Sequence, residues 1–388
     1  TCRRKLAKAK TRGTFPPLTM PEAIEKFLGI KAAGSTFARE ALAGATTFLT
    51  MSYIIFVQPA VLSGSLTGQP TGMDFGALTT ATCLAAAFAT LLMAVVARYP
   101  VALAPGMGAN FFFVLGVVPE AGDWRIALGV VFVSGVLFLL LTISGLRSYL
   151  LRAVSPGLGA AMAVGIGLFI AFVGLRNTGL ILSSPATSVT MSTVFTSPDL
   201  IVFFAGFIIT AALHARRVPG SILWGIIAST LLALVIRFII IPLLSSETQN
   251  TPLIAESMLM TRFAPADGVL QAPPDVSPVF LQLDVIGALS LQMAPLIVMF
   301  LFIDLFDTMG TLLAVGQRAG LTDAEGRLER PERAFLADAT GTVAGAAIGQ
   351  STVTSYIESI SGIEQGGRTG LTALFVAGYF LLALFFCP

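Results

Sequence analysis

Long apolar stretches, free of any charged residue, recur along the chain. They cover residues 41–73, 75–97, 99–119, 126–146, 153–175, 218–236, 339–357 and 369–388. A helix needs roughly 20 apolar residues to cross a hydrocarbon core of about 30 Å. With Gly, Pro and charge as boundaries, the pattern predicts spans near 42–63, 76–97, 102–117, 126–146, 153–174, 200–214, 219–241, 294–316, 334–349, 350–362 and 369–388. The third and tenth are too short or too polar for ordinary helices.

The basic residues alternate between the two sides of these spans. With the N-terminus inside, 19 of the 23 Lys and Arg residues fall in inner connections, and only Arg125, Arg176, Arg237 and Arg262 fall outside. Lys and Arg concentrate on the cytoplasmic side of membrane proteins. The distribution supports the number of spans and predicts a cytoplasmic N-terminus, with residues 1–40 as a cytosolic basic segment.

The spans form two related halves, separated by residues 242–293, which are rich in Pro, Ser, Thr and Asp. Each half begins with a long apolar helix and a helix of small residues. Each then meets a broken polar segment, Ala104 to Asn110 in the first half and Gln350 to Glu358 in the second. Because seven spans precede the break, a second copy must be inverted in the membrane. Inverted repeats with broken helices at corresponding positions are typical of secondary transporters.

Composition excludes several other classes of protein. Hydrophobic residues make up 55% of the 388 residues and charged residues 11%, whereas a soluble domain carries roughly 25% charged residues. Three scattered cysteines predict no disulfide framework, and a single histidine leaves no zinc site. A net charge of +2 does not indicate nucleic acid as a partner. We expect neither an enzyme nor a cofactor.

Two carboxylates interrupt the apolar span at 294–316. Asp304 and Asp307 are three residues apart, which places them close together on one helix face. An ionisable group at membrane depth is costly and usually lines a substrate or proton path. At least one of the two is therefore expected to function in transport. The alternative is that both are structural, each pairing only with its neighbours.

The tenth span is dominated by polar side chains: residues 350–361 contain one Gln, four Ser, two Thr, one Tyr and Glu358. The run Ser351 to Ser355 favours an extended backbone, which a membrane tolerates only where it is buried in protein or lines a cavity. Glu358 would then lie near the start of a short helix, where free N–H groups favour electron-rich ligand atoms. The alternative is a carboxylate at the inner surface that meets Arg368.

The third span is broken by Pro105 and by two glycines, and it carries the amide of Asn110 beside the aromatic run 111–113. Carboxylates, an amide, hydroxyls and rings suit a neutral, flat, hydrogen-bonding solute such as a nucleobase. The candidate segments contain no basic residue, which argues against an inorganic anion. The residues alone predict a proton-coupled or sodium-coupled carrier of a small polar molecule.

Four motifs carry a more specific likeness. They are AGATTFLTMSYIIFVQP at 43–59, APGMGAN at 104–110, FIDLFDTMGT at 302–311 and STVTSYIES at 351–359. In this order they resemble the hypoxanthine/guanine/adenine permeases of the nucleobase–cation symporter-2 family. The resemblance covers the chain from about residue 25 onward. It implies inward transport of a purine base, in bacteria generally with protons.

The resemblance also implies a fold of two inverted seven-span repeats. A core domain would comprise 41–150 and 294–388, the first half of a gate domain 151–241, and an outer linker 242–293. About eleven spans are present in this sequence, whereas the family continues through three more gate helices. The chain would then be a fragment of a longer protein, or would bind purines without transporting them. A carrier of another small solute or anion on the same fold is a further alternative.

The residues that match the family's functional positions, motif by motif, divide into two groups. The expected substrate-binding residues are Asp304, Glu358, Asn110, Ser351 and Thr352. The expected proton-coupling residues are Asp307 and Asp304. Phe111 stands where the family has a smaller residue. The resemblance places the protein as a multi-pass permease in an inner or plasma membrane, and family members are often homodimers.

Overall fold

The computed structural model describes residues 22–145, 156–184, 187–216, 218, 221–261, 268, 270–323 and 328–386. Part of the predicted basic segment, residues 1–21, lies outside these ranges. Among the described residues, the helices long and apolar enough to cross a membrane are Phe37–Leu62, Phe75–Ala97, Trp124–Ile143, Pro198–Ala215, Trp224–Leu243 and Ala294–Ala319. Each of them coincides with a predicted span, so the polytopic helical fold is confirmed.

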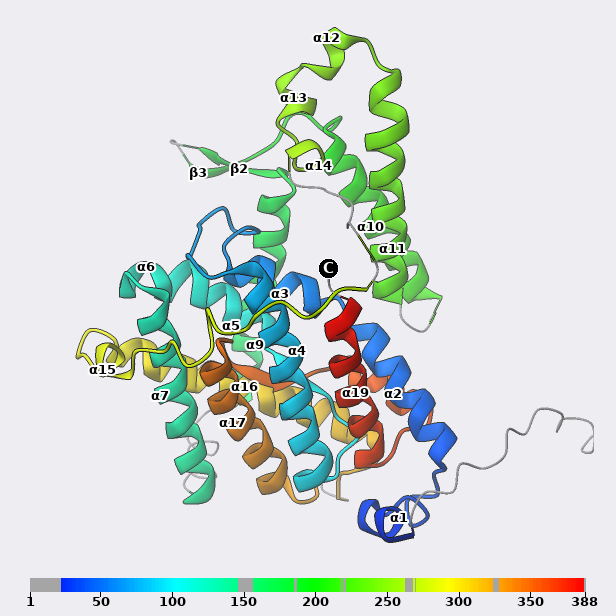
Figure 1. Cartoon of the computed structure of the whole chain (residues 1–388), viewed down its shortest axis with the longest axis vertical. Coiled ribbons are helices and arrows are strands. Elements are labelled where there is room, and N and C mark those ends of the chain that lie inside the picture. Colours follow the sequence, from blue (N-terminus) through cyan, green and yellow to red (C-terminus); the bar gives the residue numbers. More distant parts are fainter. Residues whose placement is uncertain are drawn as a thin grey trace, which may run out of the picture.

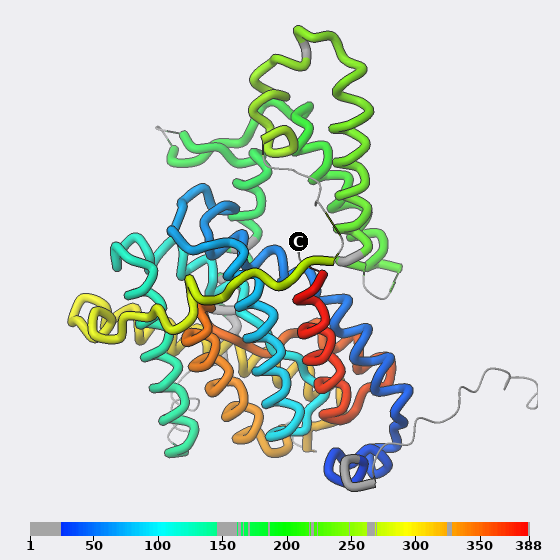
Figure 2. The backbone as a smooth tube through the Cα atoms, in the orientation of Figure 1, coloured from blue at the N-terminus to red at the C-terminus, as the bar shows by residue number. Residues whose placement is uncertain are grey.

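Helices from both halves of the chain pack into one bundle (Figure 1). Its members are α2 (Phe37–Met51), α3 (Ile54–Leu62), α4 (Phe75–Leu92), η1 (Met93–Ala97), α7 (Trp124–Ile143), α16 (Ala294–Ala319), α17 (Pro331–Ile348), α19 (Gly370–Ala383) and η5 (Leu384–Phe386), preceded by the short α1 (Glu22–Leu28). Helix α17 packs against α7 and α4, and α19 packs against α2 and α4. Figure 2 shows the blue start and the red end of the bundle side by side.

The third and tenth spans are each a short strand followed by short helices. The third contains β1 (Leu103–Pro105), α5 (Met107–Phe112), η2 (Phe113–Val117) and α6 (Val118–Ala121), and the tenth contains β4 (Val353–Ser355) and α18 (Ser359–Glu364). The two strands pair antiparallel, with Leu103 opposite Ser355 and Pro105 opposite Val353. Backbone bonds from Gly106 to Thr352 and from Tyr356 to Ala102, both 2.9 Å, extend the pairing. The extended backbone predicted in the tenth span is thus confirmed, and the break predicted in the third span also contains a strand.

This pairing explains how an extended backbone is accommodated among apolar helices. Buried N–H and C=O groups must find partners inside the protein when no water is present, and each strand supplies them to the other. Gly345 of α17 allows β4 to lie directly on that helix, because a Cβ atom there would stand 2.7 Å from the side chain of Val353. The first half repeats the order of the second: a long helix, a strand and a short helix.

The linker between the halves consists of two parts. Its first part contains α12 (Ser246–Gln249), α13 (Pro252–Ala255) and α14 (Met258–Thr261). Both carboxylate oxygens of Asp199, in α10 (Pro198–Ala215), accept from α14. One accepts from the Met258 N–H at 2.8 Å and the other from the Leu259 N–H at 3.0 Å. The second part, residues 270–284, crosses the bundle and ends at α15 (Val285–Ala288). Backbone bonds of 2.8 and 2.9 Å join Leu281 to Ala347 and Asp284 to Arg125. This second part is therefore attached to the bundle by backbone hydrogen bonds.

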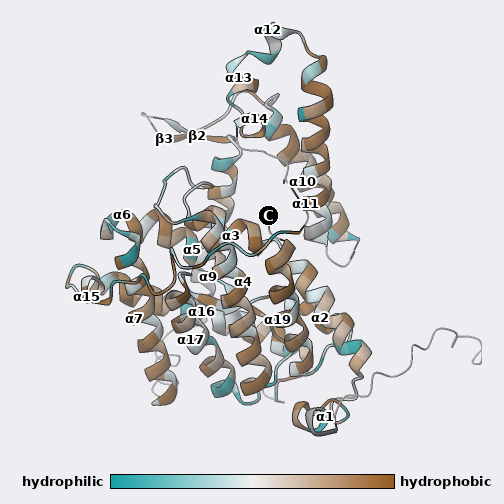
Figure 3. Ribbon diagram, in the orientation of Figure 1, coloured by the Kyte–Doolittle hydropathy of each residue, from teal (hydrophilic) through white to brown (hydrophobic). Residues whose placement is uncertain are grey.

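The remaining elements extend from the bundle in Figure 1. They are α9 (Pro156–Asn177), β2 (Ile181–Ser184) paired with β3 (Ser188–Met191), α10 (Pro198–Ala215), α11 (Ser221–Val235), η3 (Ile236–Ile240) and η4 (Ile241–Leu243). Helix α9 touches α16 and α5. Figure 3 shows α10 and α11 coloured largely as hydrophobic, and large apolar side chains such as Phe207 and Leu231 are exposed on them. Such surfaces suit contact with lipid rather than water.

Candidate functional site

Helix α16 brings the two predicted carboxylates to the paired strands, since it contacts β4, α18 and α5. Asp304 is buried and turned toward α17, where the Thr342 hydroxyl donates to its Oδ2 at 3.2 Å. The same hydroxyl oxygen lies 2.9 Å from the Val353 carbonyl oxygen and accepts from the Val353 N–H at 3.2 Å. Asp304 is therefore connected to β4 through one threonine.

Asp307 has a different environment from Asp304. It is partly buried, contacts the side chain of Thr354 and interacts electrostatically with Glu358. Gly106 is its neighbour in the other broken span, because a Cβ atom there would lie 3.8 Å from Asp307 Oδ2. That position would also lie 3.4 Å from the Thr352 hydroxyl oxygen. Asp307 thus faces the place where the two broken spans meet.

Glu358 precedes the first residue of α18 and receives a hydrogen bond from the other half of the chain. The Tyr53 hydroxyl, between α2 and α3, donates to Glu358 Oε1 at 2.8 Å. Arg368 instead donates to the carbonyl oxygens of Ile363 and Gly367, at 2.6 and 2.7 Å. The interpretation of Glu358 as a surface partner of Arg368 is therefore not what the structure shows. Its carboxylate is held inside the bundle by a phenol.

Asn110 and Ser351 are fully buried and bonded to each other. The Ser351 hydroxyl donates to Asn110 Oδ1, and Asn110 Nδ2 donates to Gln58 Oε1 in α3. Gln58 Nε2 in turn donates to Gln350 Oε1 at 2.8 Å, and Gln350 Nε2 donates to the Leu78 carbonyl oxygen at 3.1 Å. Thr352 is also buried, with its carbonyl oxygen accepting from the Gly106 N–H.

The aromatic run beside Asn110 packs into the protein. Phe111 meets the ring of Phe169 in α9 edge to face, with centroids 6.4 Å apart, and Phe112 meets Phe300 at 5.3 Å. Phe113 is fully buried. Phe111, at the position where the resemblance leads us to expect a smaller residue, therefore fills the contact between α5 and α9.

Three functional candidates were not identified from sequence: Tyr53, Gln58 and Asp338. Asp338 is fully buried in α17 and accepts from the Thr308 hydroxyl at 2.7 Å. A further hydroxyl contact, 3.2 Å from Thr308 to Thr354, connects it to β4. Two of these residues lie inside the first motif, where a polar side chain in an apolar run was the available signal. Asp338 directly precedes the charge-free stretch 339–357 and therefore resembles an interfacial charge.

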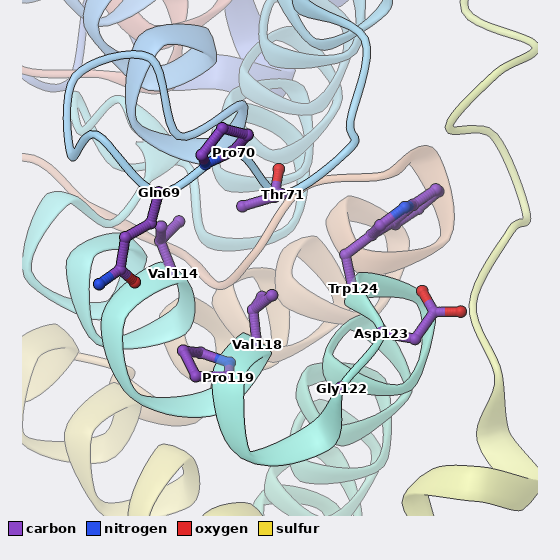
Figure 4. A pocket seen from close by; sticks show the side chains of 9 residues that line it. All are labelled: Gln69, Pro70, Thr71, Val114, Val118, Pro119, Gly122, Asp123 and Trp124. Carbon is purple, nitrogen blue, oxygen red and sulfur yellow. The ribbon is translucent and has the colours of Figure 1, made fainter.

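A separate hollow of about 310 Å³ lies between the loop before α4 and the segment before α7 (Figure 4). Its lining residues are Gln69, Pro70, Thr71, Val114, Val118, Pro119, Gly122, Asp123 and Trp124. Two of its polar side chains have partners within the protein: Thr71 donates to the Leu62 carbonyl at 2.6 Å, and Asp123 accepts from the Arg125 N–H at 2.9 Å. The carboxylates near the paired strands are thus the stronger candidate site.

The donor set of that site suits an organic solute. It combines the carboxylates Asp304, Asp307 and Glu358 with a phenol and with hydroxyl groups, which together can recognise N–H and C=O groups. Within the described ranges, no group of three His, Cys, Asp or Glu residues is placed to hold a metal ion. Charged acceptors at this depth can also bind and release protons.

Known proteins resemble this chain over most of its length. The model of the permease family matches residues 38–388. A Methanocaldococcus jannaschii protein is 46% identical over 94% of this chain and 77% of its own length. The adenine permease AdeP of Escherichia coli is 37% identical, covering 94% and 75%, and the guanine/hypoxanthine permease PbuG of Bacillus subtilis is 38% identical, covering 94% and 78%.

A solved structure has the same fold. The transmembrane domain of the cyanobacterium bicarbonate transporter BicA aligns with a TM-score of 0.58, covering 89% of this chain and 82% of that domain. The two sequences are 15% identical. At that level the likeness concerns the fold alone.

Proposed function

The chain belongs to the permease family, and from that premise we propose that it carries purine nucleobases such as hypoxanthine, guanine or adenine into the cytoplasm by proton symport. The observation that carries this proposal is the group of buried or partly buried carboxylates where the two broken spans meet. Purines present N–H groups to carboxylates and ring faces to aromatic side chains. The adenine and guanine/hypoxanthine permeases among its relatives support the same substrate class.

The proposed site assigns different roles to the carboxylates. Glu358 and Asp304 bind the base, with Asn110, Ser351 and Thr352 completing the binding site. Asp307 and Asp304 exchange the coupled proton as the site moves between the two sides. A carboxylate in a low-dielectric environment shifts toward its neutral form, which supports this role in principle. The distribution of Lys and Arg supports a cytoplasmic N-terminus, and an inward proton gradient would drive the coupled uptake.

Uptake into cells lacking their own purine carriers tests the proposal. Cells producing the full-length protein are expected to accumulate labelled hypoxanthine, guanine or adenine above cells with an empty vector. A protonophore should abolish the accumulation, and replacing sodium with potassium should leave it unchanged. Accumulation of none of the three purines would contradict the substrate class, whereas sodium dependence would contradict proton coupling.

Tyr53→Phe tests whether the phenol orients Glu358. The substitution keeps the ring but removes the donor that lies 2.8 Å from the carboxylate. Because hydrogen bonds to charged groups contribute roughly 1.5–3 kcal/mol, KM for purine uptake is expected to rise about tenfold or more. Tyr379→Phe is the matched control, since the Tyr379 ring packs against Phe48 and Phe375. Equal KM values for the two variants would show that Tyr53 does not orient the site.

A further inference from the structure

A chain of buried polar side chains joins both broken spans to α3 and α4. Gln58, Asn110, Gln350 and Ser351 are all fully buried. Each amide donates to the next, as described above, and the series ends at the carbonyl oxygen of Leu78 in α4. Gln58 stands in the middle, because it accepts from Asn110 of the first half and donates to Gln350 of the second. Without it, the two amides would have no common partner.

The Leu78 carbonyl fixes the direction of every bond in this chain. A carbonyl oxygen only accepts, so Gln350 must turn its NH₂ group toward α4 and its oxygen toward Gln58. Gln58 must then donate to that oxygen and accept from Asn110. Asn110 consequently turns its oxygen to the Ser351 hydroxyl, which has to donate. The orientation of the amide at the site is thus set by a backbone group in another helix.

We propose that Gln58 is a positioning residue that determines which purine edge the site accepts. This inference rests on the proposed function. With Gln58 in place, Asn110 Nδ2 has one N–H directed at Gln58 and, within the part of the chain that the structure describes, a second N–H that can donate to a base, while the Ser351 hydroxyl oxygen can still accept. Hypoxanthine and adenine differ at position 6, where one has a carbonyl oxygen and the other an amino group. If the Asn110 amide could rotate by 180°, it would present an acceptor in place of a donor, and the site would discriminate less between hypoxanthine and adenine.

Gln58→Leu tests this role by removing both hydrogen bonds at similar volume. KM for the preferred base of the pair is expected to rise about tenfold, as the loss of a buried hydrogen-bond partner implies. The ratio of the hypoxanthine and adenine KM values should move toward one, with kcat changed much less. Thr82→Val is the matched control, because Thr82 donates to the same Leu78 carbonyl at 2.7 Å. That variant is expected to lose stability while keeping the wild-type ratio.

Two further measurements address a variant that folds poorly. Gln58→Glu should retain more affinity than Gln58→Leu, since a neutral carboxyl group also offers one donor and one acceptor. Separately, the losses of melting temperature in detergent caused by Gln58→Leu, Ser351→Ala and the double variant should be non-additive, because Asn110 is bonded to both Gln58 and Ser351.

The outcomes separate this inference from the proposed function. If the wild-type protein takes up no purine, the proposed function is wrong, and the melting temperatures alone decide: additive effects would overturn the hydrogen-bond chain, and coupled effects would support it. If purine uptake is present, an unchanged KM ratio in Gln58→Leu at matched protein level would reduce Gln58 to a structural residue and overturn the proposal.

Discussion

Glu358→Gln is expected to lower purine uptake at low substrate concentration by about ten- to a hundredfold, because one charge-assisted acceptor is worth roughly 1.5–3 kcal/mol. The amide that replaces the carboxylate has only one acceptor oxygen. Its NH₂ group would face either the Tyr53 hydroxyl, which now donates to Glu358 Oε1, or the N–H groups of the base. Toward the base, the NH₂ group would meet another donor; toward Tyr53, it would donate to the phenol oxygen, and the Tyr53 hydroxyl would lose its acceptor.

The measurement is the initial rate of labelled purine uptake against concentration, at equal protein level in the membrane. Glu364→Gln is the matched control, because Glu364 is the last residue of α18 and is exposed. We expect Glu364→Gln to behave like the wild type. A Glu358→Gln variant with wild-type KM and kcat would show that the substrate binds elsewhere, and the assignment of the site to the broken spans would have to be abandoned.

The broken spans could be predicted from sequence, but their pairing could not. Pro105 and the glycines near it stop a helix, and the hydroxyl-rich run from Ser351 favours a strand. Both signals depend only on neighbouring residues, so the sequence is sufficient to predict the two breaks. The pairing of Leu103 with Ser355 joins residues about 250 positions apart, and no local pattern indicates such a partner. Once the two extended segments are known to be buried, their pairing is explained by the need of buried backbone N–H and C=O groups for hydrogen-bond partners.

The carboxylates of the site were predictable because of their cost in an apolar helix, but their orientation was not. Positions three apart on a helix of 3.6 residues per turn point in directions about 60° apart. That difference is enough to turn Asp304 toward Thr342 and Asp307 toward Gly106 and Glu358. Tyr53, which donates to Glu358, lies in the other half of the chain, so this contact could be identified only in the three-dimensional structure.

The buried acids at the ends of spans were not identified from sequence, because a carboxylate in that position shows no obvious energetic cost. A carboxylate at the edge of an apolar run looks like an interfacial charge in contact with water. Asp338 and Glu40 both occupy such edges, and both side chains are fully buried. Each has polar groups of a neighbouring element around it, which sequence spacing does not display. One of them is expected to be decisive for folding.

Glu40 links the start of α2 to the start of α19. Its carboxylate accepts from the N–H groups of Arg368, Thr369 and Thr372, at 3.1, 3.3 and 3.2 Å, and from the Thr372 hydroxyl at 2.5 Å. The first N–H groups of a helix have no partners within the helix. Glu40 supplies them from another helix, and its negative charge is favourable at a helix N-terminus.

Glu40→Ala is therefore expected to destabilise the protein by about 3 kcal/mol or more, since several buried donors would lose their charged acceptor together. The measurement is the apparent melting temperature of the purified protein in detergent. Glu25→Ala is the control: it removes an acid from the preceding helix whose partner, Lys31, lies 2.9 Å away and is 80% exposed, and such surface pairs contribute about 1 kcal/mol or less.

The effect of Glu40→Ala on transport should differ from that of the site variants. The cap holds the turn between α18 and α19, and Glu358 precedes α18. If the bundle still folds at low temperature, Glu358 and Tyr53 keep their contact, so KM should stay near the wild-type value while the amount of folded protein falls. A melting temperature equal to that of Glu25→Ala would contradict the capping role. A raised KM in fully folded Glu40→Ala protein would show that the cap also shapes the binding site.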